Sequence, residues 1–299
     1  MKKVIPSLLL ACVLFACKKN TAPNESPASE SKIPVNFSLT NFLVSQEDMS
    51  ANGRVQADPS LSGFKKIFYM AFKSDGSPYN YIVQDSTDIN FGNISDSLFP
   101  GTYTVALGAW NRKGLYNSNI TTNHSRLDSA AFNSFNAKPT GDFFYKKLQV
   151  TVSNGITSHN DVTLNRIVGL LKVELKDALP ASDTSGAVSV SISGVPQTYL
   201  VNADIASYNY GNSSIDRTSQ TTWEYYLFGS TNPLSLTIYW KDRLTGAPQS
   251  KTISNVVVSA NKKTIVTGYL YGIPTNVAGS FVMKTNQTWS SDSTVISIN

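Results

Sequence analysis

A pair of carboxylates facing each other across a cleft is the arrangement with which glycosidases cleave their substrates. Two groups of acidic residues are close enough in sequence to be considered: Asp85, Asp88 and Asp96, and the pair Glu47 and Asp48. Each group lies in a turn-like segment, where a carboxylate usually accepts hydrogen bonds from backbone amides. The segment that starts at Asp85 also lacks the central glycine and terminal glutamate of an EF-hand loop. We therefore interpret both groups as turn caps or solvated surface.

Histidine and cysteine, the other common catalytic and metal-binding residues, are scarce. The chain has two histidines, His124 and His159, and two cysteines, Cys12 and Cys17, both near the N-terminus. These counts exclude a His-only zinc cluster and leave the body of the chain without thiols for a disulfide, a metal site or a Cys–His pair. The sequence also has no G-x-S-x-G elbow, Walker loop or dinucleotide-binding glycine motif. We therefore predict a protein that is not an enzyme and uses no metal or other cofactor.

Cys17 is the residue whose surroundings predict a specific chemical modification. After Lys2 and Lys3, residues 4–15 form an apolar run too short to span a bilayer, which takes about 20 residues. The end of this run, Leu14-Phe15-Ala16-Cys17, resembles the lipobox of bacterial lipoprotein precursors, although Phe15 is bulkier than the usual residue there. This resemblance implies that residues 1–16 are a signal peptide and that Cys17 is lipidated. The alternative is a plain signal peptide with an incidental cysteine.

Residues 17–32 are polar and contain Pro23, Pro27 and several Ser, Asn and Glu, which predicts a flexible tether. Several acyl chains on one cysteine bury enough methylene groups, at about 0.8 kcal/mol each, for lasting attachment to a membrane. Lys18 stands where an aspartate would resemble an inner-membrane retention signal. We therefore expect a lipid-anchored protein of the outer membrane, on either its periplasmic or its outer face.

The elements that must position any functional residue are predicted to be strands. Strand-like patterns separated by turn signals recur at 35–39, 66–72, 103–107, 143–152, 162–175, 188–192, 234–238, 256–258, 264–271, 281–284 and 295–298. A short helix is expected only within 125–135. Many short strands with turns between them predict an all-β fold built from sandwiches.

The charge of the chain argues against nucleic acid as a partner. The formal net charge is +5, but the basic residues are scattered and form no stripe. Only 15% of residues are charged, against roughly 25% in an average soluble domain, and neutral polar residues take their place. This composition is typical of β-proteins outside the cytoplasm.

Large aromatic residues are predicted to serve either the core or a binding surface. The four tryptophans, each at an end of a strand-like segment, are assigned to core packing: Trp110, Trp223, Trp240 and Trp289. Four tyrosines in loop-like stretches are better candidates for an adhesive or glycan-binding surface: Tyr79, Tyr81, Tyr208 and Tyr210.

An internal echo predicts two similar domains. Residues 103–110, 147–152 and 162–164 follow one another as strand, turn, strand, turn, strand, and residues 234–240, 253–258 and 265–270 repeat this order. We therefore predict two β-sandwich domains, 33–165 and 166–299, after the tether.

Several segments together resemble the fimbrillin (type V pilin) superfamily of Bacteroidales-type pili, and within it the lipoprotein anchor and accessory proteins. Besides the lipobox and tether, they are 35–42, 64–76, 99–105, 164–173 and 257–264. The resemblance implies two tandem transthyretin-like β-sandwiches of Greek-key type. It also implies assembly with other pilin subunits by strand exchange, in which a protease removes the first strand and a partner's strand fills the groove.

Arg54, in a loop after the first predicted strand, is where the resemblance would place such a cleavage. The alternative is an ordinary loop arginine, and an anchor is expected to keep its lipidated N-terminal segment. Residues 281–299 are either a donor strand or the last strand of the second sandwich. We therefore predict a fimbrial anchor or accessory subunit. A lipoprotein that captures glycans through exposed aromatics is the alternative, and a hydrolase with a dispersed site comes last.

Overall fold

The structure is a computed structural model of the chain, and it describes residues 31–43, 61–111, 120–134, 141–177, 188–271, 281–286 and 293–297. The chain divides into two units, Met1–Ser31 and Lys32–Asn299, and the strands all belong to the second. Some residues discussed above lie outside the described residues, among them Cys12, Cys17, Glu47, Asp48, Arg54 and Trp289.

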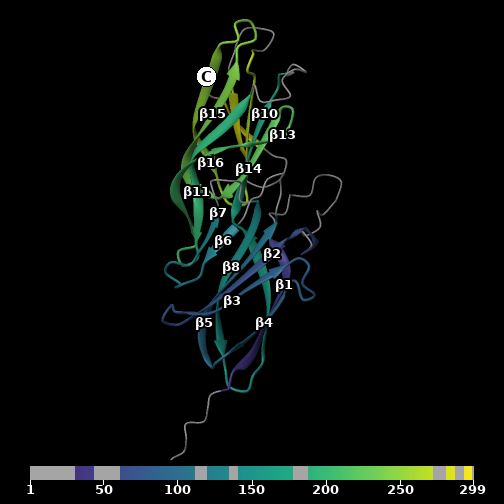
Figure 1. Cartoon of the computed structure of the whole chain (residues 1–299), viewed down its shortest axis with the longest axis vertical. Helices are drawn as coiled ribbons and strands as arrows, with labels where there is room; N and C mark the ends of the chain where they lie inside the picture. The colour runs from purple at the N-terminus through teal and green to yellow at the C-terminus, as the bar shows by residue number, and fades with distance from the viewer. Residues whose placement is uncertain are drawn as a thin grey trace, which may run out of the picture. The chain divides into compact units, whose positions relative to one another are not determined.

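Nineteen strands and a short 3-10 helix, η1 (Leu61–Gly63), make up the secondary structure of the described residues, so the all-β prediction is confirmed. The strands form three sheets (Figure 1). The helix expected within 125–135 is wrong, because residues 127–129 form a turn and β7 (Ala131–Ser134) follows it. As a strand, β7 pairs with two neighbours while Phe132 enters the core.

The first sheet holds most of the N-terminal half, in the order β3-β2-β5-β8-β9-β1-β4. Its strands are β1 (Ile33–Leu43), β2 (Lys66–Lys73), β3 (Pro78–Asp85), β4 (Asn93–Leu98), β5 (Gly101–Asn111), β8 (Asp142–Val152) and β9 (Ser158–Arg166). Alternate residues along a strand point to one face, and here they enclose an apolar core that includes Phe37, Tyr69 and Leu164.

The second and third sheets share another core. The second sheet runs β13 (Asp216–Ser219), β14 (Thr222–Phe228), β10 (Val168–Leu175), β17 (Lys263–Gly268), β18 (Phe281–Asn286) and β19 (Ser293–Ser297). The third runs β16 (Pro248–Val258), β15 (Ser230–Lys241), β11 (Ser189–Leu200), β7 and β6 (Ile120–Asn123), with β12 (Ile205–Ser214) beside β11. Side chains of both sheets, among them Leu171, Trp223 and Leu236, make up this core.

The pairing pattern of the first sheet recurs in the second half. β1 lies between β9, which runs parallel to it, and β4, which runs antiparallel, and β10 lies in the same way between β17 and β14. β5 pairs with β2 and β8, as β15 pairs with β11 and β16. The strands that correspond include the three pairs of segments in the sequence repeat, which lie on β5 and β15, β8 and β16, and β9 and β17. It supports a division into two similar domains near Arg166, which we keep as a proposal.

The two halves are joined through apolar contacts. The strand predicted over 162–175 is in fact two strands, because the chain leaves the first sheet at Arg166 and enters the second at Val168. Ile167, between them, donates its amide hydrogen bond to the carbonyl of Phe143. A third core bridges the halves with residues that include Phe68, Phe132, Phe143, Tyr199 and Phe228.

Candidate functional site

β1 fills a slot inside the first sheet. It forms eight residue pairs with β9 on one side and six with β4 on the other. Its alternate residues Ile33, Val35, Phe37 and Leu39 belong to the core, and each is at most 6% exposed. Without β1, the backbone groups of β9 and β4 and the apolar side chains between them would line an open groove. This arrangement is suited to holding an extended strand by backbone pairing.

Side chains link β3 and β4, the two outer strands of this sheet. Asp96 of β4 accepts hydrogen bonds from the Tyr69 hydroxyl at 2.8 Å and from Asn80 Nδ2 at 2.8 Å. The Tyr79 hydroxyl donates to the carbonyl oxygen of Ser97 at 3.3 Å. Asp96 therefore links the two outer strands of the sheet. The prediction that it lies in a turn is wrong, because it is part of β4.

The buried phenol of Tyr69 predicts how stability depends on pH. Burial, and then the neighbouring carboxylate of Asp96, raise the pKa of Tyr69 well above its ordinary value of about 10. The unfolded chain therefore releases this proton at a lower pH than the folded chain. The stability that protonated Tyr69 contributes is complete below about pH 10 and is lost as pH rises above it. We expect the free energy of unfolding to fall as pH rises above about 10, and to fall less steeply in Tyr69→Phe. Urea unfolding between about pH 8 and 11 measures both slopes, and equal slopes would contradict the prediction.

A buried ion pair lies where the two halves meet. The guanidinium of Arg166 donates to both carboxylate oxygens of Asp142, from Nε at 2.8 Å and from Nη2 at 3.0 Å, and both side chains are 4% exposed. The guanidinium also lies 4.8 Å from the ring centroid of Phe144 and donates to Asn261 Oδ1 at 3.4 Å. A Cβ on Gly229 would overlap the backbone of the neighbouring turn, which shows how tightly this region is packed.

Sequence reasoning placed a domain boundary at Arg166 but missed its partner Asp142. Arg166 lies between two apolar strand patterns, where a charged side chain is expected to be buried. A buried charge needs an opposite charge nearby, and this was the signal for a carboxylate partner. Because each charge already neutralises the other, the pair fixes the geometry of the junction and leaves no charge for a ligand.

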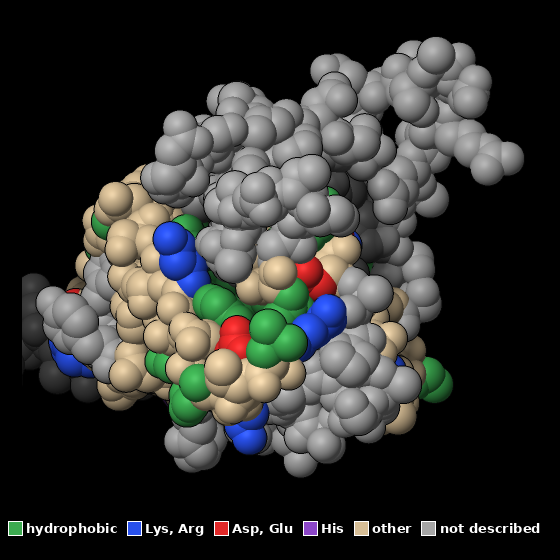
Figure 2. Space-filling model, turned by 90° about the horizontal axis from the view of Figure 1, so that it is seen from above, with side chains coloured by type: hydrophobic (Ala, Val, Ile, Leu, Met, Phe, Trp, Pro, Cys, Tyr) green, Lys and Arg blue, Asp and Glu red, His purple; other side chains and the backbone are tan. Residues whose placement is uncertain are grey.

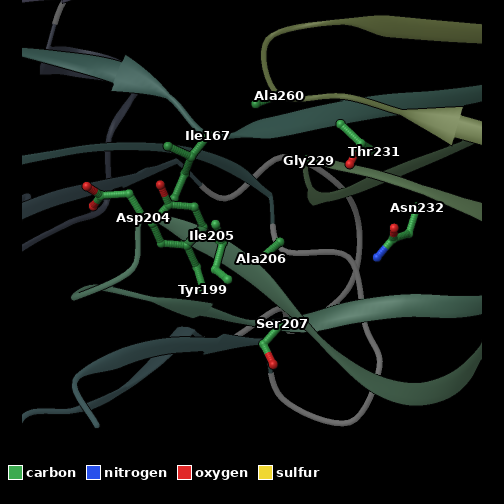
Figure 3. Close-up of a pocket in the computed structure, with 10 residues that line it drawn as sticks. All are labelled: Ile167, Tyr199, Asp204, Ile205, Ala206, Ser207, Gly229, Thr231, Asn232 and Ala260. Atoms are coloured by element: carbon green, nitrogen blue, oxygen red, sulfur yellow. The ribbon is translucent and has the colours of Figure 1, made fainter. Parts of the chain in front are cut away.

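Beside the junction lies an open hollow of about 470 Å³, lined by residues of β11, β12 and β15 and by the β16–β17 turn (Figure 3). Figure 3 shows Asp204 and Tyr199 on one side of it and Thr231 and Asn232 on the other. Asp204 carries the only charge among the described residues that line the hollow. Its carboxylate is already bound to Lys147 Nζ at 2.9 Å and to the Tyr145 hydroxyl at 3.0 Å. The hollow therefore has no unpaired charge among its described residues.

A second hollow, of about 490 Å³, lies over β15, β11 and β12 of the third sheet. Uncharged polar side chains dominate its lining: Ser189, Ser191, Ser193, Asn212, Ser214, Ser235 and Thr237. Tyr239, at the end of β15, also lines it and is 46% exposed. Hydroxyl and amide groups both donate and accept hydrogen bonds, so this surface suits an uncharged, hydroxyl-rich ligand. The alternation of Ser with apolar residues along β11 was the sequence signal for it.

The aromatic predictions have mixed outcomes. Trp110 and Trp223 are 4% and 2% exposed and Trp240 packs against the core, so core packing is confirmed for these three tryptophans. The prediction that four tyrosines lie in loops is wrong, because β3 contains Tyr79 and Tyr81 and β12 contains Tyr208 and Tyr210. Polar residues alternate with these tyrosines as in a strand, although their composition is that of a loop.

Tyr81 is also no exposed platform, since it is half-buried. Its ring stacks on His124 with centroids 4.0 Å apart, and its hydroxyl lies 2.7 Å from Thr122 Oγ1. The other histidine, His159, is exposed and lies 3.4 Å from Asp161. Among the described residues, no group of three His, Cys, Asp or Glu side chains is placed to hold a metal ion.

The remaining acidic residues of the first candidate group act as predicted. Asp88 accepts a hydrogen bond from the amide of Asp85 at 2.9 Å, and Asp85 pairs with Lys66 at 3.2 Å on the surface.

The described residues contain no helix of the length and apolar character needed to cross a membrane.

The C-terminal residues pair as the last two strands of the second sheet. β18 forms six residue pairs with β17, and β19 forms five with β18. β19 is the outer strand at this end of the sheet. The two strands extend the sheet beyond the pattern that the halves share.

Three β-sheets held together by apolar cores, with one strand enclosed in a slot, define an all-β protein of the sandwich type. Residues 31–290 match the family described as fimbrillin-A associated anchor proteins Mfa1 and Mfa2, and the chain belongs to this family. Membership places it in the cell envelope, among proteins that contact other fimbrial subunits. No curated protein sequence matches the chain.

Solved structures with the same fold come from Bacteroides species. A candidate adhesin from Bacteroides ovatus has a TM-score of 0.55 and 11% identity, with 90% of this chain and 95% of that chain covered. A candidate polysaccharide-binding protein from Bacteroides thetaiotaomicron has a TM-score of 0.54 and 11% identity, covering 89% and 98%. These two show that the fold is shared. The fimbrial anchor protein Mfa2 from Porphyromonas gingivalis also matches, with a TM-score of 0.45, 11% identity and coverage of 85% and 96%.

Proposed function

We propose that the chain is a non-enzymatic fimbrial subunit, anchored in the outer membrane by a lipid on Cys17, that keeps its N-terminal strand. Its family supports a fimbrial role, and the lipobox-like segment supports the anchor. The observation that carries the proposal is β1, held inside the first sheet with its alternate side chains in the core. Cleavage at Arg54 would cut the covalent link between the lipid and everything after β1. An anchor must therefore escape that cleavage.

The free energy that holds β1 in the first sheet sets how much binding free energy an incoming strand must supply to displace it. Burial of its four core side chains contributes on the order of 6–12 kcal/mol, at about 1.5–3 kcal/mol each. This is comparable to the whole stability of many domains. A cut at Arg54 therefore does not by itself release β1. An incoming strand replaces it only by supplying similar apolar side chains and both backbone ladders.

The contact with the next subunit is assigned to the C-terminal strands. With β1 retained, the slot in the first sheet is closed to other subunits. β19 is held by one ladder of five residue pairs, so it leaves the sheet at a smaller cost than β1 leaves its slot. The freed strand then fills, in a neighbouring subunit, a slot like the one that β1 fills here. This is assembly by β-strand complementation.

Expression of the full-length chain together with fimbrial subunits tests the proposal. The mature chain isolated from membranes should have the mass of a lipidated chain that begins at Cys17. Cys17→Ser should lose the lipid and the membrane attachment, whereas the matched control Cys12→Ser should keep both. A chain that ends at Asn286, and so lacks β19, should stay in the membrane while fimbriae appear in the medium.

Two outcomes of this experiment contradict separate parts of the proposal. A mature chain that begins at Val55 within assembled fimbriae rules out the anchor role and identifies a stalk subunit. Fimbriae that stay attached to cells carrying the truncated chain rule out donation of β19 and leave the anchor role intact. Resistance of the purified chain to an Arg-specific protease supports retention of β1.

The hydroxyl-lined hollow of the third sheet favours glycan capture as a second function. Tyr239 offers an exposed ring for stacking on a sugar, beside serine and threonine hydroxyls that bond sugar hydroxyls. Tyr239→Ala should weaken binding on an array of neutral glycans at least tenfold, while Leu244→Ala, on the following turn, should leave it unchanged. Equal binding by the two variants would argue against this site.

A further inference from the structure

One end of the first sheet gathers the start of β1 and three turns. The register places Ile33 beside Leu98, so the β4–β5 turn lies next to the first residue of β1. The β8–β9 turn is at the same end, because Val35 pairs with Ser158. The β2–β3 turn joins them, because Lys73 pairs with Tyr103 near the start of β5. Figure 1 shows β4 and β5 at this lower end and β10 and β15 near the upper end.

Aromatic rings and lysines are in contact at this end. The ring of Tyr79 lies 5.2 Å from that of Tyr103 and 6.5 Å from that of Phe99, both nearly perpendicular to it. Lys32 Nζ lies 5.6 Å from the Tyr79 centroid and 5.5 Å from the Phe99 centroid, and Lys73 Nζ lies 6.0 Å from Tyr79. The ammonium groups of Lys32 and Lys73 are thus within cation–π distance of aromatic rings where the chain enters the sheet.

Two apolar side chains project from the same end. Phe99, in the β4–β5 turn, is 38% exposed, and Ile156, in the β8–β9 turn, is 64% exposed. Exposure of apolar side chains to water is unfavourable, so a second surface that covers these neighbouring turns is favoured. Asp75 is the acidic residue of the β2–β3 turn, and its carbonyl oxygen accepts a hydrogen bond from Arg126 Nη2 at 3.3 Å. Asp96 pairs with Val35 near the same end, and Asp128 lies 3.6 Å from Arg126, so this end carries charges of both signs.

We propose that this end of the protein, defined by Lys32, Lys73, Tyr79, Phe99 and Ile156, rests on the headgroup region of the membrane. The proposal rests on the lipidation of Cys17 proposed above. Residues 18–32 span at most about 50 Å even when fully extended, so they keep Lys32 near the bilayer. A tether of this length also gives the end a high effective concentration at the surface, so that weak contacts suffice.

The side chains at this end match the chemistry of the membrane interface. Aromatic residues with a polar tip favour the headgroup level, where the ring is half in lipid and the hydroxyl is in water. Lysines extend their ammonium groups toward phosphates while their stems follow apolar surface. Phe99 and Ile156 enter the boundary of the acyl chains, as the apolar side chains of interfacial proteins do.

The opposite end provides a matched control. Leu244, in the β15–β16 turn, is 96% exposed, and Arg243 lies 3.8 Å from the ring centroid of Tyr271 nearby. Figure 2 looks onto the upper end of Figure 1, where a small group of apolar side chains lies between basic and acidic ones and other apolar side chains are scattered around it. This end also carries an exposed aliphatic side chain on a turn, whereas the proposed lipid tether leads to the other end.

The test places an environment-sensitive fluorophore on each end of the lipidated full-length protein. Ile156→Cys and Leu244→Cys each introduce a single reactive thiol, because Cys17 carries the lipid and Cys12 is removed with the signal peptide. The labelled proteins are inserted into phosphatidylethanolamine–phosphatidylglycerol vesicles. We expect the emission of the label at position 156 to shift to the blue and to be quenched by headgroup-level spin-labelled lipid. The label at 244 should do neither. Adding Lys73→Glu should at least halve the quenching at 156.

Each other outcome overturns the proposal in a recognisable way. If both proteins are bound to vesicles and neither label responds, lipidation stands but the end does not rest on the membrane. If both labels respond equally, contact with the membrane is not specific to this end. If the proteins stay in solution, the proposed lipid anchor itself fails, and the membrane contact fails with it.

Discussion

Replacement of Asp142 by alanine is expected to lower the free energy of unfolding by about 3–5 kcal/mol, because it leaves a buried guanidinium without its carboxylate. Arg166 is 4% exposed at its side chain and donates two hydrogen bonds to Asp142. Water cannot reach the guanidinium to compensate for the loss. Urea unfolding of the purified chain, followed by tryptophan fluorescence, measures the difference, since Trp110 and Trp223 report from different cores.

Two further variants show whether this loss comes from the unpaired charge. Asp161→Ala removes a carboxylate from an exposed pair with His159 and should cost no more than about 1 kcal/mol. Asp142→Leu combined with Arg166→Met removes both buried charges and should recover most of the lost stability. If the double variant is as unstable as Asp142→Ala, the pair contributes through shape and hydrogen bonds that apolar residues cannot replace, and the stated reason is wrong.

Replacement of Phe37 by alanine is expected to lower the free energy of unfolding by about 3–5 kcal/mol, because it opens a cavity in the first core. Phe37 is 0% exposed, and its ring centroid lies 5.4 Å from that of Tyr69. It is also the largest of the four side chains of β1 that are described in the core. Thermal and urea unfolding measure the loss, and the same variant should make β1 easier for an added strand peptide to displace.

Ser38→Ala is the matched control, since Ser38 follows Phe37 on the same strand and points to the other face. Its hydroxyl donates to Asn93 Oδ1 at 3.0 Å in an exposed position, so its loss should cost at most about 1 kcal/mol. Equal losses in Phe37→Ala and Ser38→Ala would mean that β1 is held by its backbone alone. In that case the apolar side chains would not select the strand that fills the slot.

Much of the fold was predictable because alternation along a strand is a local property. The segments at 35–39, 103–107, 143–152, 188–192 and 234–238 lie within observed strands, apart from residue 188 just before β11, and their apolar residues face the cores. The observed strands are longer than the predicted segments. The order of strands and turns in the two halves was also readable, and it reappears as a repeated pairing pattern. Where composition replaced alternation as the guide, as at Tyr81 and Tyr208, the prediction of a loop was wrong.

By itself, the sequence determined the all-β class, the positions of most strands and the lipobox-like segment at Cys17, because each depends on neighbouring residues. The tertiary structure alone decided that β1 is enclosed between β9 and β4, that Asp96 links two outer strands, and that Asp142 neutralises Arg166. These features join residues far apart in the chain. Which of them meet is set by the packing of whole sheets, and no local pattern of side chains carries that information.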